Sequence, residues 1–418
     1  MVKILVLVFP LLLAFAVPVA YAMLGATGMA LWLEGKPMAV MAQRLYSPTQ
    51  SFPMLAIPFF ILAGSLMMSG TFGEHLVKFA KLLVGRFQGG MGQVSIVGSV
   101  IFGGVSGSAV ADASALGNAL IPIQKREGYP LGLAAAINSC SSTISVLIPP
   151  SIPLILFGLV SNTSIVDLFV AGLLPGIAIG LALTAVVWWK ARRHNLPPTV
   201  VEGGWQAFRR EAKRALPALL MPVFVIGTLR FGIATPTEVA IMAVAYALFV
   251  GVVIYRDLGL RQIYQAIIET GVMTGAVMLI IMASSSIQWI LTAERTPQML
   301  AEWMLASFSE PWMIILALNL IMLVVGTFLD LPAAVLLLGP LFVGIGQAIG
   351  LDMVQLGLMM VLNLAIGLYT PPVGTTLFIS ATIAKVPIGT VVRELLPFYM
   401  VALIATLLIS YVPALTIY

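Results

Sequence analysis

The chain has 418 residues, of which 60% are hydrophobic and only 9% are charged, and its mean hydropathy is +1.08. A soluble domain carries about 25% charged residues, so this composition excludes a soluble protein and indicates a polytopic membrane protein. The net charge of +5 gives no reason to expect nucleic-acid binding, because the basic residues stand in loops between apolar runs. The single cysteine, Cys140, excludes an internal disulfide and favours a buried structural thiol.

Runs without Asp, Glu, Lys or Arg mark the membrane segments, because a spanning helix needs about 20 such residues. The runs comprise residues 4–33, 45–73, 87–111, 128–166, 168–189, 215–229, 239–255, 270–293, 311–329, 331–351, 353–384 and 395–418. The start of the first run resembles a signal peptide. It continues to residue 33, however, which is long enough to span, so we expect a retained N-terminal helix.

Two stretches have arms that are too short to cross a membrane. The first, at about 88–124, turns around Ser106-Gly107-Ser108, and the second, at about 312–344, turns around Gly326-Thr327. Small residues between two short apolar arms are typical of a turn. We therefore predict a re-entrant helical hairpin at each place.

Each predicted hairpin is followed by an apolar run that contains two adjacent prolines. Pro149-Pro150 lies within 131–160 and Pro371-Pro372 within 353–384. Two prolines remove two backbone donors and clash with the preceding turn, so the helix must break at membrane depth. Such a break is tolerated only where protein or a polar cavity satisfies the freed groups, and a matched pair points to a secondary-transporter site.

The two halves of the chain share one order of features. Pro149-Pro150 and Pro371-Pro372 are 222 residues apart (371 − 149), as are the two Leu-Leu-Pro motifs at 173–175 and 395–397. A hairpin does not change membrane side, so a repeat with an odd number of crossings would be inverted. We therefore predict an all-α polytopic membrane protein of two inverted repeats, a common design of alternating-access carriers; the family resemblance given below implies the elevator type found in the ion-transporter superfamily.

The predicted division assigns 1–50 to an N-terminal scaffold helix with its connection, and 196–262 to a basic cytoplasmic segment with central scaffold helices. Repeat 1 comprises 51–195 and repeat 2 comprises 263–418. The basic residues at 190–214 place that segment in the cytoplasm, either as an amphipathic surface helix or as a solvated linker. Downstream, Thr235-Pro236-Thr237-Glu238 predicts a helix start with a capping box.

The tips and breaks carry hydroxyl, amide and carbonyl oxygens but no thiolate or imidazole. Oxygen ligands suit Na⁺ or another hard cation, and helix N-termini favour an anionic solute. The substrate-contact candidates are Gly107, Asp112, Asn138, Ser142, Ser151, Thr327, Asp330, Asn363, Gly374 and Thr375. Small polar residues also let membrane helices pack closely, and the two acids, Asp112 and Asp330, are equally suited to stabilising helix starts.

Four motifs together resemble a known family. They are Ser106-Gly107-Ser108-Ala109 with Asp112, Ile148-Pro149-Pro150-Ser151, Ala234-Thr235-Pro236-Thr237-Glu238, and Thr370-Pro371-Pro372-Val373-Gly374. The chain resembles, over essentially its whole length, the large membrane subunit of tripartite ATP-independent periplasmic (TRAP) transporters. The resemblance implies a multi-pass protein of a bacterial inner membrane, which imports organic acids such as C4-dicarboxylates or sialic acid by an elevator mechanism driven by two or more Na⁺.

The resemblance also implies partners and ion sites. A periplasmic solute-binding protein delivers the carboxylate, and a small four-helix membrane subunit, expected as a separate chain, braces the scaffold. By motif position, one Na⁺ site uses Ser106, Ser108, Ser145, Ile148 and Pro150. The other uses Gly326, Leu329, Gly367, Thr370 and Val373. The alternatives are a stand-alone divalent-anion/Na⁺ symporter and, more remotely, an intramembrane aspartyl protease that uses Asp112 and Asp330; we otherwise expect no enzyme activity.

Overall fold

The computed structural model describes residues 1–199, 204–308 and 310–416, and within these ranges all regular elements are helices. The α-helices are α1 (Val2–Ala14), α2 (Val19–Leu33), α3 (Ala39–Tyr46), α4 (Ala56–Met68), α5 (Phe72–Val84), α6 (Gly90–Ser106), α7 (Ala109–Arg126), α8 (Leu131–Ser141), α9 (Ile152–Ser161), α10 (Ile165–Arg193), α11 (Gly204–Arg230), α12 (Pro236–Phe249), α13 (Leu260–Ala293), α14 (Thr296–Ser307), α15 (Pro311–Gly326), α16 (Leu331–Ala348), α17 (Met353–Gly367), α18 (Thr375–Ala384) and α19 (Ile388–Tyr411). Short 3₁₀ turns η1 (Ser47–Gln50), η2 (Phe52–Leu55), η3 (Ser142–Val146) and η5 (Pro413–Leu415) and a π-helical turn η4 (Val250–Tyr255) complete the set.

In the described ranges, six helices are long and apolar enough to cross a membrane. A seventh span is possible if the pair Ala39–Gln50 and Phe52–Met68, bent by 66°, counts as one crossing. Most of the remaining apolar helices are shorter than a span, as hairpin arms and half-helices must be. The prediction of an all-α polytopic membrane protein is confirmed.

The N-terminal run forms two helices, so the prediction of a single N-terminal scaffold helix is wrong. The chain turns between α1 and α2 at Ala16, whose φ is +58°, and at Pro18, which directly precedes α2. Backbone N–H groups of Ala16 and Val17 close the end of α1 by bonding to its last carbonyls. The two helices then pack against each other, and α2 also packs on α13.

Each half of the chain contains a helical hairpin followed by a broken helix. The arms α6 and α7 meet at Gly107, and α8 is separated from α9 by η3 and the Pro149–Pro150 bond. In the second half, α15 and α16 form the hairpin, and Pro371–Pro372 separates α17 from α18. Both proline pairs therefore end a helix within an apolar run, as the loss of two backbone donors requires.

The equivalent long helices of the two halves, α10 and α19, run antiparallel. Lys190 near the end of α10 forms an ion pair with Glu394 near the start of α19. At the other end of this pair of helices, Leu174 and Pro175 share a groove with Leu408 and Ile409. Since α10 and α19 hold the same place in the two halves, the repeats are inverted.

The hairpins enter from opposite ends of this helix pair. Thr199 lies shortly after the end of α10. Its hydroxyl donates to the Glu127 carboxylate (2.8 Å) at the base of the first hairpin. The Tyr411 hydroxyl at the end of α19 bonds to the Trp312 carbonyl (2.9 Å) at the base of the second. The two tips consequently point toward each other from opposite sides.

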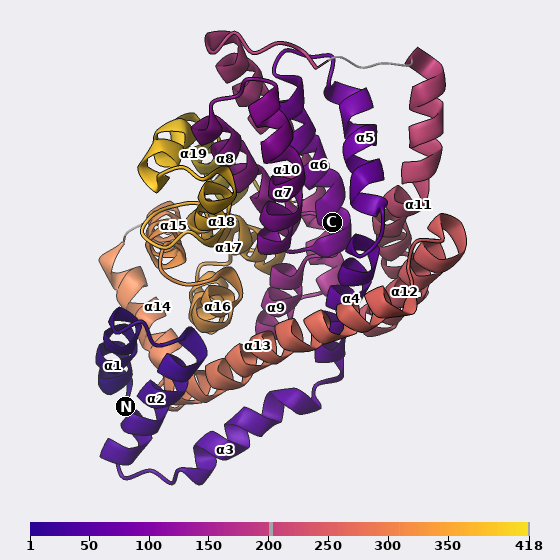
Figure 1. Ribbon diagram of the computed structural model, residues 1–418. Coiled ribbons are helices and arrows are strands. Elements are labelled where there is room, and N and C mark those ends of the chain that lie inside the picture. Colours follow the sequence, from indigo (N-terminus) through magenta and orange to yellow (C-terminus); the bar gives the residue numbers. More distant parts are fainter. Residues whose placement is uncertain (200–203, 309, 417–418) are drawn as a thin grey trace.

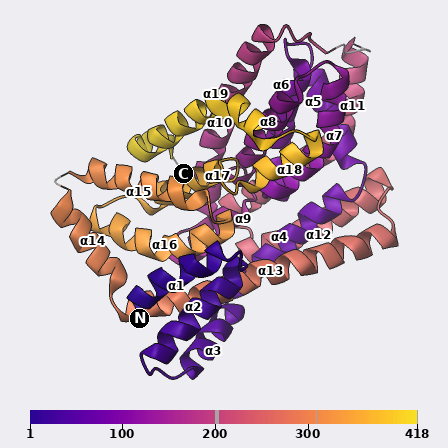
Figure 2. The ribbon, with the colours of Figure 1, turned by 60° about the vertical axis from the view of Figure 1, so that its left-hand side comes forward.

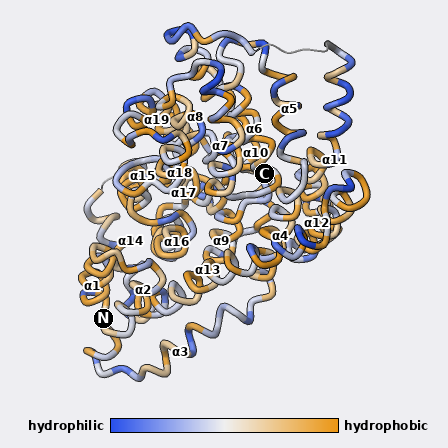
Figure 3. Tube along the Cα trace, in the orientation of Figure 1, coloured by the Kyte–Doolittle hydropathy of each residue, from blue (hydrophilic) through white to orange (hydrophobic). Residues whose placement is uncertain are grey.

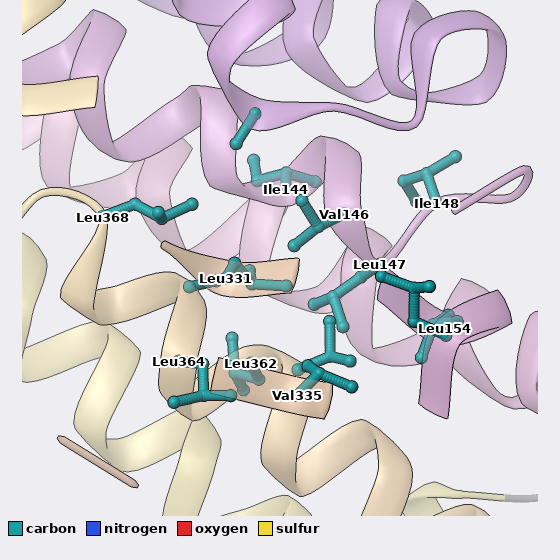
Figure 4. Close-up of a cluster of buried hydrophobic side chains, with 14 of the residues drawn as sticks. Ile144, Val146, Leu147, Ile148, Leu154, Leu331, Val335, Leu362, Leu364 and Leu368 are labelled. Carbon is teal, nitrogen blue, oxygen red and sulfur yellow. The ribbon is translucent and has the colours of Figure 1, made fainter. Parts of the chain in front are cut away.

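The two repeats share one apolar core. Figure 4 shows residues around the first break, such as Leu147, gathered with Val335 of the second hairpin and Leu362 of α17. The half-helix after each break packs on the second arm of the opposite hairpin, α9 on α16 and α18 on α7. This exchange holds the hairpins and broken helices together as one unit, which we call the core unit.

A second group of helices lies along one side of the core unit. Helix α13, 34 residues long, runs diagonally across the molecule, with α2 packed on it and α4 packed on both α13 and α12 (Figures 1 and 2). We call α2, α4, α12 and α13 the scaffold. Helix α12 begins with the predicted capping box, in which Thr235 N–H bonds to Glu238 (2.7 Å).

The basic segment is only partly described, because residues 200–203 lie outside the described ranges. Its second part is neither a surface helix nor a linker. It forms the first turns of α11, which are hydrophilic and lead into a more hydrophobic second half (Figure 3). The basic residues therefore stand at the end of a helix long enough to span.

Candidate functional site

The tip of the first hairpin lies directly on the first proline break. Gly107 has φ +59°, and a Cβ at this position would clash with the Pro150 carbonyl oxygen. One turn earlier, a Cβ at Gly103 would stand 2.6 Å from Ser145 Cα. Of the five residues of the first predicted Na⁺ site, Ser145, Ile148 and Pro150 contact glycines of the first arm and tip, and Ser106 and Ser108 flank the tip glycine Gly107.

The second tip repeats this arrangement with different residues. Gly326 and Gly367 pack so closely that a Cβ on Gly367 would clash with the Gly326 carbonyl. The Thr327 carbonyl accepts a hydrogen bond from Val373 N–H (3.2 Å), which ties the tip to the break. Thr370 follows Gly367 in the same turn and bonds to its carbonyl (3.0 Å), and Leu329 is buried behind the tip.

A cavity of about 590 Å³ opens between the core unit and the scaffold. The first hairpin supplies Ser106, Gly107, Ser108, Ala109 and Ser114, and the second supplies Asp330, Leu331 and Pro332. The scaffold wall consists of residues of α4 and α13: Ile61, Gly64, Ser65, Met68, Glu269, Met273, Ala276 and Val277.

Three helices begin at this cavity. Ala109 of α7, Ile152 of α9 and Leu331 of α16 are the first residues of their helices, and all three line it. The first turn of a helix presents unpaired N–H groups and positive potential, which attract an anion. Among the described residues, the lining includes the acids Glu269 and Asp330 but no Lys, Arg or His.

Of the ten predicted substrate contacts, Gly107 and Asp330 line the cavity and the others do not. Several of the others are buried residues whose polar groups are already bonded inside the protein. The Asn138 amide bonds to the Ala113 carbonyl (2.9 Å), Ser142 bonds to the Ser139 carbonyl (2.9 Å), and Asn363 bonds to Asn319 (2.7 Å). Ser151 caps α9 through Leu154 N–H (3.4 Å).

Three others lie at the second tip and break, and the last, Asp112, is described below. Thr327 is half-buried at the tip, Gly374 has φ +49° just before α18, and Thr375 is the first residue of α18. Thr375 Oγ1 is buried without a hydrogen-bond partner among the described residues.

Neither acid stabilises a helix start by a side-chain cap. Ser108 is the N-cap of α7 and accepts from Ala111 N–H (3.4 Å), whereas Asp112 lies in the first turn of the helix and faces Ser99 of α6. Asp330 holds the N-cap position of α16 but makes no side-chain capping bond. The two acids therefore differ in environment, since Asp112 is fully buried and Asp330 lines the cavity.

The scaffold side of the cavity is not predicted from the sequence. Glu269 lies within α13 and is bonded by the Ser65 hydroxyl of α4 (3.3 Å). A search for charge-free runs places Glu269 at the edge of a segment, although α13 begins nine residues earlier at Leu260. The signal that locates this start is the Gln262 side chain, which caps Gly259 N–H (2.6 Å).

The oxygen-rich character of both tips fits a hard, weakly polarising cation. No group of three or more His, Cys, Asp or Glu side chains that could hold a metal occurs in the described part of the chain. Hydroxyl and carbonyl oxygens at the tips are ligands that suit an alkali or alkaline-earth ion and not a transition metal. The Cys140 thiol is buried, as predicted.

Comparison with protein families gives one match over nearly the whole chain. Residues 6–415 match the family described as "Tripartite ATP-independent periplasmic transporter, DctM component". The chain is 50% identical to "Uncharacterized protein y4mL" of Sinorhizobium fredii, with 99% of both chains covered. It is 36% identical to the C4-dicarboxylate TRAP transporter large permease protein DctM of Pseudomonas aeruginosa, over 90% of this chain and 88% of that protein.

A relative with a different named substrate is similar to the same extent. The sialic acid TRAP transporter large permease protein SiaM of Vibrio cholerae is 37% identical, with 90% of this chain and 88% of that protein covered. Among solved structures, the YdaH transporter of Alcanivorax borkumensis matches with a TM-score of 0.55 at 14% identity, over 86% of this chain and 84% of that one. This last likeness concerns the fold alone and agrees with the predicted fold class.

Proposed function

The chain belongs to the DctM family of TRAP transporter components, and from this premise we propose that it is the large membrane subunit of a Na⁺-coupled importer of organic acids. The substrate is a carboxylate of the class to which C4-dicarboxylates and sialic acid belong, because relatives similar to this chain carry those names. The protein acts in a bacterial inner membrane. Its partners are a small membrane subunit and a periplasmic solute-binding protein.

One observation carries this proposal: the first turns of α7, α9 and α16 converge on a cavity without basic side chains. An organic anion in this cavity meets N–H groups and positive helix potential instead of a fixed cation. Asp330 and Glu269 oppose an anion that enters alone. Cations bound beside it at the two tips offset that repulsion, which couples anion entry to Na⁺.

Alternating access follows from the position of the cavity. Its walls come from two groups of helices, the core unit and the scaffold, so sliding one past the other carries the bound solute across the membrane. Both tips and both breaks belong to the core unit and would move together. The ions and the solute would therefore be transported together.

Reconstituted uptake tests the proposal. The purified subunit with its small membrane partner in proteoliposomes, supplied with the solute-binding protein and a radiolabelled C4-dicarboxylate or sialic acid, should accumulate substrate only with an inward Na⁺ gradient. Replacing external Na⁺ by choline should reduce uptake to the level of empty liposomes. Uptake that is unchanged in choline would contradict the coupling.

The same assay separates the alternatives. A stand-alone divalent-anion/Na⁺ symporter would take up substrate without the solute-binding protein, whereas the proposed transporter would not. The intramembrane protease is no longer an alternative, because the family is that of a transporter component. In addition, Asp112 is enclosed inside the first hairpin while Asp330 faces the cavity, so the two acids do not share one site.

A further inference from the structure

Asp112 is a buried carboxylate that the cavity does not use. Its neighbours in α7, Ala111 and Ala115, line the cavity, but Asp112 itself is 0% exposed and faces α6. Its Oδ1 is 3.3 Å from Ser99 Oγ, and its Oδ2 has no hydrogen-bond partner among the described residues. None of the ion pairs in the described ranges includes it. A carboxylate in this position needs a positive charge to remain ionised.

Two further oxygens complete a cluster that joins three helices. Ser99 Oγ of α6 is 3.1 Å from Ser141 Oγ of α8, and Ser141 Oγ is 3.3 Å from the Asn138 carbonyl oxygen. Ser99 and Ser141 are 1% and 0% exposed. The cluster is thus enclosed, and it is separate from the contacts of the hairpin tip with the break.

The spacing of these oxygens is wide for hydrogen bonds. A hydroxyl that donates to a carboxylate normally stands about 2.5–2.7 Å away. The next hydroxyls along the same stretch make shorter bonds: Ser142 to the Ser139 carbonyl (2.9 Å), Thr143 to the Cys140 carbonyl (2.7 Å) and Ser145 to the Ser142 carbonyl (2.6 Å). The separations of 3.1–3.3 Å around Asp112 are longer than these, and what sets the cluster apart from other buried hydroxyls is the unpartnered carboxylate oxygen of Asp112.

This spacing lies at the lower edge of the range for oxygens that surround one cation, so a bound ion would draw the oxygens slightly apart. Na⁺ is close in size to Ca²⁺, whose oxygen ligands lie about 2.3–2.6 Å away, so two ligands at a right angle are roughly 3.3–3.7 Å apart. One carboxylate with neutral oxygens calls for a single positive charge, because a divalent ion would leave a net charge buried in the membrane. The chemistry of the cluster therefore favours a monovalent ion.

We propose that Asp112, Ser99, Ser141 and the Asn138 carbonyl form a third Na⁺ site, inside the first hairpin and behind the cavity wall. The proposal rests on the Na⁺ coupling proposed above and adds an ion to the two at the hairpin tips. The second repeat does not duplicate the site. Ala317 stands 218 residues after Ser99 and Asn363 stands 222 after Ser141, so one hydroxyl is lost and the other is replaced by an amide bonded to Asn319.

Direct Na⁺ binding to the purified transporter complex tests this site. Radiolabelled Na⁺ is titrated onto the complex in lipid nanodiscs without organic substrate, and the ions bound per complex are counted. Asp112→Asn, which keeps the shape of the side chain, should bind one Na⁺ fewer than wild type. Ser99→Ala and Ser141→Ala should raise the Na⁺ concentration for half-occupancy of that site by about ten- to hundredfold.

The matched control is Ser286→Ala in α13. Ser286 is also 1% exposed, but it only donates to the Ala283 carbonyl of its own helix (2.7 Å), so its variant should bind as wild type does. If Asp112→Asn does not assemble, the two serine variants decide the question.

The outcomes distinguish this inference from the proposed function. The third site would be overturned if all three variants bind as many Na⁺ ions as wild type and with wild-type affinity. If the wild-type complex still couples uptake to Na⁺, the proposed function stands. Asp112→Asn that keeps its ion count but makes uptake independent of pH would overturn the third site too, in favour of a proton. A wild-type complex that binds no Na⁺ would overturn both.

Discussion

Gly107 shows how closely the first hairpin tip is fitted to the break. The residue ends α6 in the left-handed region, and the Pro150 carbonyl occupies the space where a side chain would begin. Glycine meets both demands, since it has no Cβ and enters the left-handed region without penalty. The contact leaves the tip hydroxyls of Ser106 and Ser108 at the edge of the cavity.

Gly107→Ala should therefore abolish most transport and lower stability. The left-handed backbone costs about 1–2 kcal/mol for alanine, and overpacking against Pro150 adds about 1–3 kcal/mol. Gly128→Ala is the matched control, because Gly128 also has positive φ (+83°) but has open space around it. The control variant should lose only the stability that the left-handed backbone costs alanine, and it should keep wild-type uptake. Equal losses of uptake in both variants would show that the tip contact is not required.

At the scale of residues, the sequence predicts which residues form the tips and breaks better than it predicts where their side chains point. Ser106-Gly107-Ser108 and Pro149-Pro150 are recognisable because small residues and paired prolines have few uses in an apolar run. The orientation of Asp112 toward Ser99 is not predictable, because a hairpin arm is apolar on both faces and periodicity cannot say which face meets the cavity. Glu269 is not predicted from the sequence, because its charge marks the edge of a charge-free run, whereas α13 continues through it.

Helices α10 and α19 are the elements that make the inversion visible. They occupy the same place in the two halves and lie antiparallel, with Lys190 near the end of α10 paired with Glu394 near the start of α19. The two side chains are only 13% and 22% exposed, so this ion pair is less screened than one at the surface.

A charge swap tests this packing. Lys190→Glu or Glu394→Lys alone should destabilise the complex by about 1–3 kcal/mol, between the values for exposed and buried pairs, and the double swap should recover part of the loss. Thermal unfolding in detergent measures these changes in stability. The exposed pair Lys78–Glu74 on α5 is the control, and its swaps should change stability by less than about 1 kcal/mol. Additive losses at Lys190 and Glu394 would contradict a direct pair.

At the scale of elements, the sequence predicts well where a helix breaks or is capped. It predicts poorly whether an apolar run forms one helix or two. The proline pairs and the capping box at Thr235 are local and decided by backbone chemistry. The turn at Ala16 that divides the N-terminal run carries no strong local signal before Pro18, because alanine favours helix. The continuation of the basic segment into α11 depends on packing against α5, which only the fold supplies.

The molecule as a whole has two hairpins that open to opposite sides. Their bases lie beside the end of α10 and the end of α19, two helices that run in opposite directions. This arrangement is a consequence of the inverted repeats, and it gives the cavity one tip from each side of the membrane. Sequence order alone predicts the repeats, but the pairing of α9 with α16 and of α18 with α7 comes from the fold.

Labelling with a membrane-impermeant maleimide tests the two-sided arrangement. Cys140 is the only cysteine and is buried, so a Cys140→Ala background has no reactive thiol. Arg126→Cys at the base of the first hairpin and Gln347→Cys at the base of the second, both at exposed positions, should be labelled from opposite sides of the membrane. Lys213→Cys in the basic part of α11 should be labelled from the same side of the membrane as Arg126→Cys. Labelling of both hairpin bases from one side would contradict the inversion.

Helix α13 has a consequence for how such a molecule meets its bilayer. Its 34 residues measure about 51 Å at 1.5 Å per residue, whereas the hydrocarbon layer is only about 30 Å thick. The helix therefore crosses at a tilt, or its polar first turns extend beyond the hydrocarbon layer. The side chains that it turns to the cavity, Met273, Ala276 and Val277, are small or pliable. In the transport cycle proposed above, a core unit that slides past α13 would meet these small or flexible side chains, and the thickness of the surrounding lipid would affect the tilt of the helix.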